Sequence, residues 1–353
     1  MAKIHTHRGR GATFSADNRY SEFQKEAFDD GWGESELQAQ IPTSLMIDNA
    51  KKVITYNQSP DLPFDRSINP YRGCEHGCVY CFARPSHAWL DLSPGLDFET
   101  KLFYKPEAPN ILRQELAHKN YRCSPIALGV NTDAYQPVDK KTELTREIIE
   151  VLIEHNHPFS IITKSSLIER DIDLLAIAAE KHLVEVSISL TTLDQTLSLH
   201  MEPRAAAPQR RLQTINTLSR AGIPVNAFLA PIIPVLNDHE MENLLVAARN
   251  NGAIDAVYIL LRLPLEVDDL FCHWLAQYAP TKVEHVMARV RDLRGGKHYD
   301  TRFGHRMKGV GVYANLLAQR FKLAYQKCAF PGGIDLRSDA FCALKDDRQL
   351  SLF

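Results

Sequence analysis

Short apolar segments alternate along the chain with stretches whose apolar residues recur at helical spacing. The apolar segments are residues 124–130, 159–163, 184–190, 224–230 and 256–261, and we expect a first short strand before them at residues 68–72. The helical stretches between them are residues 143–154, 171–181, 209–221 and 240–250. Short strands that recur every ~25–40 residues with a helix in between are typical of right-handed βαβ units and a parallel sheet. The pattern therefore predicts six βα units.

Six βα units are fewer than the eight of a closed barrel, so we expect an α/β fold with an open, partial (β/α)6 barrel of the TIM type. In such barrels the chemistry takes place at the carboxyl ends of the strands. We expect the barrel to occupy residues 61–265, after an N-terminal extension at residues 1–60 that has little periodicity. Residues 266–345 are expected to form a helical, basic C-terminal region, and residues 346–353 an exposed tail.

The charge of the chain is unevenly distributed. The net charge is −2, but residues 281–327 contain eleven Lys and Arg and three Asp and Glu. Such an excess attracts polyanions such as nucleic acid, although a pair of solvated helices has the same composition. No apolar run reaches the ~18–20 residues that span a bilayer. Residues 1–15 lack the apolar core of a signal peptide, so we expect a cytoplasmic protein with no membrane segment.

Three of the seven cysteines, Cys74, Cys78 and Cys81, follow the first predicted strand at C-x3-C-x2-C spacing. Their clustering and the odd total argue against a disulfide framework, and thiolates are ligands of iron–sulfur clusters and of zinc. Three cysteines can hold three irons of a [4Fe–4S] cluster and leave the fourth iron open to the amine and carboxylate of S-adenosylmethionine. The alternative is a zinc site with His76 or a distant cysteine as fourth ligand, but the chain has no second C-x2-C pair.

An aromatic residue, Tyr80, precedes the last of these cysteines. The loop therefore resembles the signature of the radical S-adenosylmethionine (radical SAM) superfamily. This resemblance implies a partial (β/α)6 barrel and an enzyme that cleaves S-adenosylmethionine (SAM) reductively to a 5′-deoxyadenosyl radical. It also implies that Cys74, Cys78 and Cys81 bind the [4Fe–4S] cluster and that Tyr80 lies beside the adenine.

Over residues 60–270 the chain is similar to the SplB-like branch, which is named for spore photoproduct lyase. The similarity rests on four strings, TDAYQP at 132–137, ITKS at 162–165, RD at 170–171 and MEPR at 201–204. It implies a lyase-like reaction on pyrimidine damage in DNA and an electron donor such as flavodoxin or ferredoxin. Many members of this branch have no known substrate.

Polar residues at or after the ends of the predicted strands are the candidate SAM ligands besides Tyr80. They are Asp133, Lys164, Ser187, Ser189, Glu202 and Arg204. The Lys164 ammonium suits a carboxylate, and Ser187 and Ser189 share one strand face within reach of a ribose, as structural serines also do. Glu202 and Arg204 can bind the cofactor or each other, and Asp133 can hold a ligand or form a turn.

Cys123 is a candidate catalytic residue because it lies 42 residues after Cys81. In spore photoproduct lyase, a cysteine at a similar place returns a hydrogen atom to the product radical. Against this role, Cys123 precedes its strand and lacks the flanking residues of the lyase, so a buried free cysteine is the alternative. Cys272, Cys328 and Cys342 do not repeat the motif and receive no role.

The last five residues, Gln349, Leu350, Ser351, Leu352 and Phe353, resemble the pentapeptide by which bacterial replication and repair proteins bind the β sliding clamp. Apolar side chains beside a glutamine suit a groove, and a strand packed on the body is the alternative. Together with the basic segment, the tail favours DNA as the substrate. The alternatives are a radical SAM enzyme for a peptide, a tRNA or a small molecule, and a non-enzymatic clamp-associated metal-binding module.

Overall fold

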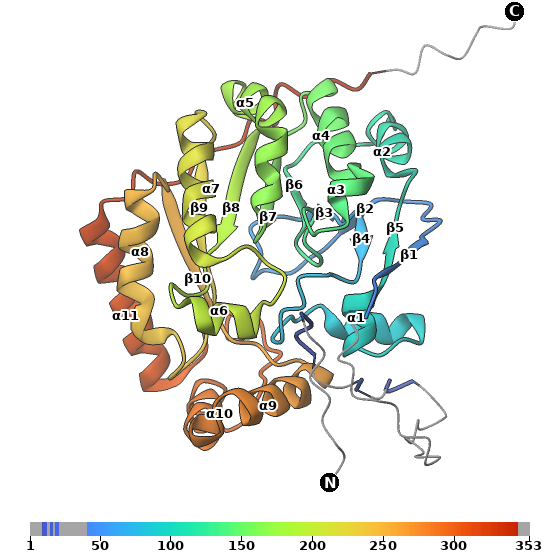
Figure 1. Cartoon of the computed structure of the whole chain (residues 1–353). Coiled ribbons are helices and arrows are strands. Elements are labelled where there is room, and N and C mark those ends of the chain that lie inside the picture. Colours follow the sequence, from blue (N-terminus) through green and yellow to red (C-terminus); the bar gives the residue numbers. More distant parts are fainter. Residues whose placement is uncertain (1–8, 13–14, 17, 21–40, 345–353) are drawn as a thin grey trace, which may run out of the picture.

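The central sheet of the computed structural model has the strand order β10-β9-β8-β7-β6-β3-β2. The structure describes residues 9–12, 15–16, 18–20 and 41–344. Strands β3 and β6 to β10 run parallel, and β2 pairs antiparallel with β3 at one edge. The six parallel strands and the helices between them confirm the predicted partial (β/α)6 barrel (Figure 1).

The strands of this sheet are β2 Ile54–Tyr56, β3 Arg66–Ile68, β6 Ile126–Leu128, β7 Phe159–Thr163, β8 Val184–Ser189, β9 Val225–Ile232 and β10 Asp255–Leu260. A second, small sheet consists of β1 Ser44–Ile47, β5 Lys101–Tyr104 and β4 Tyr71–Arg72, in that order. The helices are α1 Leu96–Thr100, α2 Ala108–Leu116, α3 Asp139–Thr142, α4 Leu144–Glu154, α5 Ile172–Glu180, α6 Gln195–Met201, α7 Pro208–Arg220, α8 Met241–Asn250, α9 Glu266–Tyr278, α10 Val283–Leu293 and α11 Gly311–Cys328. The 3-10 helices are η1 Arg84–Leu90, η2 Ser166–Asp171, η3 Asp238–Glu240 and η4 Pro280–Lys282.

The first predicted strand, residues 68–72, is wrong in its bounds. Strand β3 ends at Ile68, and Tyr71–Arg72 form β4 in the small sheet. The break falls at Pro70, because proline has no backbone N–H for a sheet hydrogen bond. The Lys105 N–H donates to the Pro70 carbonyl at 3.2 Å, so the chain leaves the main sheet just before the cysteines.

Alternating residues give the main sheet a buried face and a partly open face. In β7, Phe159 and Ile161 are buried, whereas Ser160 and Ile162 are partly exposed. The buried set of β7, β8 and β9 shares one apolar core with residues of α4, α5, α7 and α8. The partly exposed set, which includes Ser187, lines the opposite, inner face, as the two-residue period of a strand requires.

Helices α6, α9 and α10 lie together at one end of the sheet, at the bottom of Figure 1. They share a second apolar core with the cysteine segment, in which Cys78 and Tyr80 pack with Met201 and Phe271. The indole N–H of Trp274 on α9 donates to the carbonyl of the last-turn histidine of α6 at 3.0 Å. Helices α9 and α10 of the C-terminal region therefore pack onto the end of the sheet that carries the cysteines, whereas α11 packs against α8.

Residues 329–344, which are red in Figure 1, run along the opposite end of the sheet. The backbone N–H groups of Gly332, Arg337 and Cys342 donate to carbonyls that precede β10, β8 and β7. The last described residue, Leu344, is therefore at the amino ends of the strands. The clamp-like residues 349–353 lie outside the described residues.

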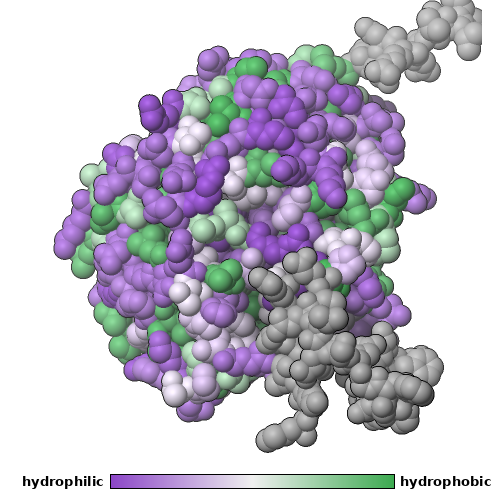
Figure 2. All heavy atoms as spheres, viewed as in Figure 1, coloured by the Kyte–Doolittle hydropathy of each residue, from purple (hydrophilic) through white to green (hydrophobic). Residues whose placement is uncertain are grey.

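Strands β1 and β2 fall within residues 1–60 and pair with strands of the two sheets. The boundary of the barrel at residue 61 and its end at residue 265 stay predictions. Among the described helices, none has the length and apolar content to cross a membrane. Figure 2 shows hydrophilic residues over most of the visible face, with hydrophobic residues in small groups between them.

Candidate active site

Cys74, Cys78 and Cys81 lie on the loop between β4 and η1, which we call the cysteine loop (residues 73–81). All three are free thiols; the first two are buried and Cys81 is partly exposed. The side chain of Gln136, which follows β6, accepts a hydrogen bond from the Glu75 N–H at 2.8 Å and donates one to the Gly73 carbonyl at 3.2 Å. Gly73 has φ +77°, and a Cβ there would lie 2.7–2.9 Å from three neighbouring atoms, so the turn requires glycine.

The donor atoms of the cysteine loop do not have the spacing of a zinc site. Among the described residues, His76 and the three cysteines provide no set of three donor atoms within 4.8 Å of one another. A tetrahedral zinc ion with thiolates at about 2.3 Å needs donors about 3.8 Å apart. A cubane is wider, and it places thiolates on separate corners. The cysteine loop therefore suits the expected [4Fe–4S] cluster.

Burial favours the protonated form of the Cys74 and Cys78 thiols. Burial raises the pKa of Cys78 to about 12, although the charge of Lys164 opposes the shift. Burial, together with Asp133 and the other two thiols, raises the pKa of Cys74 well above its ordinary value. Iron ions favour the thiolate form, so binding of a cluster releases protons.

The buried carboxylate of Glu99 joins the N-terminal residues to the cysteine loop. It accepts hydrogen bonds from the backbone N–H groups of Gly11 at 2.9 Å and Ala12 at 2.8 Å. It also forms an ion pair at 2.5 Å with Arg84, whose Nε donates to the Cys78 carbonyl at 3.0 Å. Sequence reasoning missed all of these residues, because burial of a charged pair leaves no periodic signal.

We expect Gly11→Ala to loosen the cysteine loop, because a Cβ at Gly11 would lie 1.7 Å from the Gly77 carbonyl oxygen. The displaced segment would deprive the Glu99 carboxylate of two hydrogen bonds, at a cost of about 2–4 kcal/mol. Iron retained after anaerobic reconstitution and gel filtration should fall, and the Tm should fall with it. The control is Gly333→Ala, whose added methyl meets only a carboxylate oxygen at 3.2 Å. Equal iron retention in the two variants would contradict this role.

A buried ion pair orients Tyr80. The Glu202 carboxylate accepts hydrogen bonds from the Tyr80 hydroxyl and from Arg211. Burial alone would raise the pKa of Glu202, but the charges of Arg211 and Lys164 lower it to about 2. Glu202 is therefore ionised, and the ring of Tyr80 is held against the cysteine loop. Arg211 is a site residue that sequence reasoning did not find.

Lys164 directs a positive charge toward the cysteine loop. Its Nζ lies 5.9 Å from the centroid of the Tyr80 ring. Its charge lowers the pKa of both Cys78 and Glu202, in each case against the larger effect of burial. No carboxylate oxygen of the described part of the chain lies within the 4.0 Å of an ion pair with Lys164. The ammonium group is therefore available to an anionic ligand.

Asp133 fastens the loop after β6 to the end of β7. Its carboxylate accepts from the Thr163 hydroxyl at 2.7 Å and the Lys164 N–H at 2.8 Å, and it lies 3.2 Å from His76 Nδ1. Burial raises the pKa of Asp133, but His76 and these hydrogen bonds outweigh it and bring the value to about 2. The hydrogen-bonding capacity of Asp133 is thus used within the protein.

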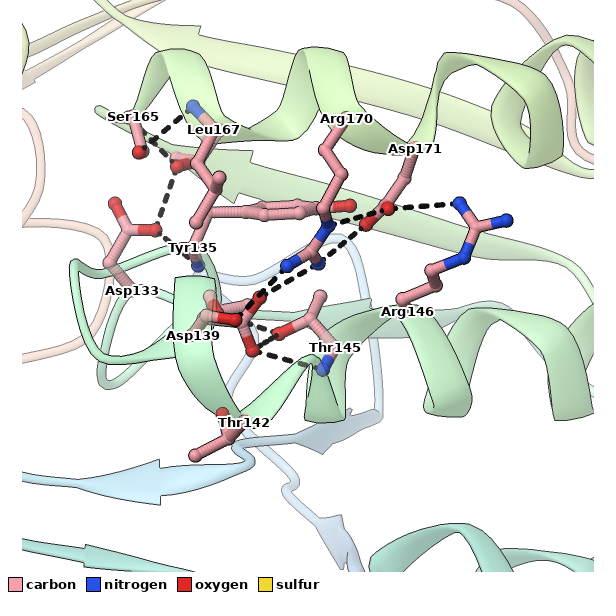
Figure 3. Close-up of polar contacts among 12 residues, drawn as sticks. Asp133, Tyr135, Asp139, Thr142, Thr145, Arg146, Ser165, Leu167, Arg170 and Asp171 are labelled. Carbon is pink, nitrogen blue, oxygen red and sulfur yellow. Dashed lines mark hydrogen bonds and ion pairs between the residues drawn. The ribbon is translucent and has the colours of Figure 1, made fainter. Parts of the chain in front are cut away.

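Arg170 and Asp171, the RD string, belong to a polar network next to the loop that follows β6 (Figure 3). Arg170 bridges the buried carboxylates of Asp139 at 2.9 Å and Asp171 at 2.8 Å, and Arg146 reaches Asp171 at 3.1 Å. The guanidinium carbon of Arg170 lies 5.9 Å from the centroid of the Tyr135 ring. This network holds α3, α4 and η2 together and thereby supports the strand ends.

The remaining SAM candidates have different surroundings. Arg204 pairs with Glu75 of the cysteine loop at 3.0 Å rather than with Glu202. Ser189 is buried, and its carbonyl accepts from Arg211 at 3.1 Å. Ser187 is partly exposed on the inner face of the barrel. Of the two serines, Ser187 is thus the more accessible to a ligand.

Cys123 lies at the other end of the sheet. It precedes β6, near Arg66 and Ser338, and burial raises the pKa of its thiol to about 11. The cysteine loop is connected instead to residues that follow β6, β7 and β8. Hydrogen-atom transfer requires contact with the substrate radical, so this placement argues against Cys123 as the donor.

Comparison with known proteins agrees with this geometry. Residues 68–248 match the family model described as the radical SAM superfamily. The chain belongs to the radical SAM superfamily. It is therefore an enzyme of the radical SAM type, and the cofactors of this superfamily are a [4Fe–4S] cluster and SAM.

Two relatives of this radical SAM enzyme are uncharacterised proteins. One, from Mycobacterium tuberculosis (strain ATCC 25618 / H37Rv), is 37% identical over 234 residues, which cover 66% of this chain and 68% of that protein. The other, from Methanocaldococcus jannaschii, is 28% identical over 235 residues, or 67% of this chain and 83% of that protein. As uncharacterised proteins, these relatives define no substrate.

Among solved structures, a variant of spore photoproduct lyase is 13% identical, with a TM-score of 0.57 over 87% of this chain and 86% of that chain. Another variant of the lyase, with bound AdoMet and dinucleoside spore photoproduct, is 12% identical. Its TM-score is 0.55 over 81% of this chain and 79% of that chain. The radical SAM enzyme therefore has the fold of spore photoproduct lyase, as the SplB-like strings predicted.

Proposed function

We propose that this radical SAM enzyme holds its cluster through Cys74, Cys78 and Cys81 and acts on a pyrimidine lesion in DNA. When bound, the cluster supplies the electron for reductive cleavage of SAM to methionine and a 5′-deoxyadenosyl radical. The electron comes from a reductant such as flavodoxin or ferredoxin. The protein contributes the residues that bind the cofactor, orient it and admit the substrate.

Three residues carry the proposed binding of SAM. The ammonium group of Lys164, which has no carboxylate partner in the described part of the chain, binds the carboxylate of the cofactor. Tyr80, held by Glu202, lies against the adenine. Ser187 on the inner face reaches the ribose. Asp133 and Arg204 act through the loop and the ion pair that they hold, since their side chains have protein partners. Ser189 is buried, and its backbone carbonyl accepts from Arg211.

The DNA substrate is proposed from a rim of cationic and aromatic residues that begins at Phe82, the residue after the cysteine loop, and includes Arg262, Tyr299, Phe303 and Arg306. The guanidinium carbon of Arg262 lies 5.0 Å from the ring centroid of Phe82, and that of Arg306 lies 4.6 Å from the ring centroid of Phe303. Arg262 also donates to the Tyr299 hydroxyl at 3.3 Å. Both phenylalanine rings are exposed, at 44% and 55%. Arg306 forms an ion pair with Asp61 at 2.5 Å, so Arg262 is the guanidinium of the rim that can bind a phosphate. Exposed rings stack on unpaired bases, so the rim suits a base extruded from DNA.

The excess of positive charge in residues 281–327 is weaker support for a DNA substrate. Arg289, Arg291, Arg302, Arg306 and Arg320 are in ion pairs with carboxylates. Arg294 is buried, and its guanidinium donates to backbone carbonyls. Most arginines of residues 281–327 therefore serve the fold, and the position of the rim beside Cys81 is the observation that favours DNA.

The test is a product screen with the reduced, anaerobically reconstituted enzyme, SAM and ultraviolet-irradiated DNA. We expect the lesion to disappear together with SAM, and binding to irradiated duplex to weaken steeply as salt rises. Arg262→Ala should weaken this binding about tenfold, because it removes a cation and frees Phe82. Arg289→Ala, which removes a cation paired on α10, is the matched control.

Two outcomes would count against a DNA substrate. The first is unchanged lesion content while SAM is consumed. The second is deuterium transfer into 5′-deoxyadenosine from a labelled peptide, tRNA or small molecule instead of from DNA. Either result would leave the radical chemistry in place and redirect the substrate.

We also propose the bacterial β sliding clamp as a partner of Gln349 to Phe353. The described chain reaches the amino ends of the strands at Leu344, opposite the cysteine loop, so a clamp bound beyond that point leaves the rim open. Leu352→Ala with Phe353→Ala should abolish clamp binding without changing SAM cleavage. Undiminished clamp binding by this variant would contradict the proposal.

A further inference from the structure

Three metal-ligating side chains meet outside the cysteine loop. Asp268 and Cys272 are one turn apart on α9, and His298 comes from the loop after α10. His298 Nδ1 lies 2.9 and 2.8 Å from the two carboxylate oxygens of Asp268, and Cys272 Sγ lies 3.7 Å from Oδ1 of Asp268. One donor atom from each residue can be chosen so that all lie within 4.8 Å of one another. No other three His, Cys, Asp or Glu residues of the described chain do so.

The separations are close to those of a tetrahedral zinc site. Zinc binds sulfur at about 2.3 Å and nitrogen or oxygen at about 2.0–2.2 Å, which places neighbouring donors about 3.3–3.6 Å apart. The histidine–carboxylate pair is slightly too close and the thiol slightly too far. Movement of the His298 and Cys272 side chains by about 1 Å corrects both distances. Asp268 and Cys272 are four residues apart on α9, which already puts these two ligands on one face of the helix.

The charges around these residues favour a cation. Asp268 pairs with His298, and within the described residues no Lys or Arg lies at ion-pair distance from its carboxylate. Asp269 adds a second negative charge near Cys272. On the side of the second apolar core, Met287 Sδ lies 3.9 Å from Cys272 Sγ and shields the thiol from water. The ligands thus share an acidic, partly shielded position.

We propose that Asp268, Cys272 and His298 bind a zinc ion, with water as the fourth ligand. A thiolate and an imidazole select zinc over magnesium or calcium, which prefer oxygen ligands only. The ion has no redox chemistry and is separate from the cysteine loop. It ties the loop after α10 to α9, and Tyr299 of the rim is the residue next to His298. The zinc therefore fixes one wall of the proposed substrate entrance.

The test counts metals in the anaerobically reconstituted enzyme, whose cluster keeps zinc out of the cysteine loop. After incubation with excess zinc chloride and gel filtration, we expect about one zinc per chain beyond the iron of the cluster. Cys272→Ala and His298→Ala should each reduce this zinc at least about tenfold with the iron unchanged. Cys328→Ala is the control and should bind zinc as the wild type does. A chelator should lower the Tm of the wild type but not that of Cys272→Ala.

Zinc at background level in the wild type, or zinc that Cys272→Ala leaves unchanged, would overturn the proposal. Iron rather than zinc at these residues would overturn the choice of metal. If an alanine variant fails to fold, Asp268→Asn serves instead, because the amide keeps the size of the side chain and can still bond to His298. Zinc binding by Asp268→Asn as tight as in the wild type would likewise overturn it. The metal count does not depend on DNA, so it stands apart from the proposed substrate.

Discussion

Cys78→Ala is expected to abolish the formation of 5′-deoxyadenosine, by at least about a thousandfold. Cys78 is buried between Tyr80 and the second apolar core, and its loss leaves two thiols for a cluster that needs three. Iron per chain should fall with the product. The measurement is chromatography of 5′-deoxyadenosine after anaerobic reconstitution, reduction and addition of SAM.

The control for this change is Cys328→Ala, which removes a partly exposed thiol at the end of α11. We expect that variant to keep its iron and to form 5′-deoxyadenosine at the wild-type rate. If Cys78→Ala also keeps both, the cysteine loop does not hold the cluster.

Arg211→Met is expected to lower the free energy of unfolding by about 3–5 kcal/mol, because it leaves the Glu202 carboxylate buried without its cation. Both side chains are almost completely buried. The matched control is Arg320→Met, which removes the partner of the exposed Glu242 and should cost about 0–1 kcal/mol. Thermal or urea unfolding of the anaerobic enzymes measures both. Similar losses for the two variants would contradict the structural role of the buried pair.

The ion pair between Arg211 and Glu202 also predicts how the free energy of unfolding depends on pH. With Arg211 in place, the pKa of Glu202 is about 2, below its ordinary 4.5, so the ionised pair stabilises the fold above pH 4.5 and weakens as the pH falls toward 2. In Arg211→Met, burial instead raises the pKa of Glu202 above 4.5, so that variant regains stability as the pH falls. The stability difference between the two proteins should therefore shrink between pH 7 and pH 4. A difference that is constant over this range would show that Glu202 is not the group that Arg211 stabilises.

Hydrophobic periodicity located most of the barrel. Strand β7 has the predicted bounds, and α4 begins one residue later than predicted, because both elements bury a regular set of apolar side chains. The first strand was misplaced because Pro70 separates Ile68, the last residue of β3, from β4 at Tyr71–Arg72. The small sheet was not predicted, since β1, β4 and β5 are two to four residues long and too short to show alternation.

Some residues of the candidate site were also predictable from the sequence, and others were not. Spacing alone was enough to find the three cysteines, because a local loop must bring their sulfurs together. Arg84, Glu99 and Arg211 were not found, since their importance comes from burial against partners that no periodic pattern reveals. Lys164 was found from its place at a strand end, and its lack of a carboxylate partner among the described residues became visible only in three dimensions. The roles of the predicted SAM ligands stay predictions.

The most direct test of the central claim is the reaction of the wild-type enzyme with SAM. Protein reconstituted without oxygen should contain about four irons per chain. After reduction it should release 5′-deoxyadenosine and methionine in equal amounts. Protein that carries zinc in the cysteine loop, or that forms no 5′-deoxyadenosine after reduction, would contradict the account.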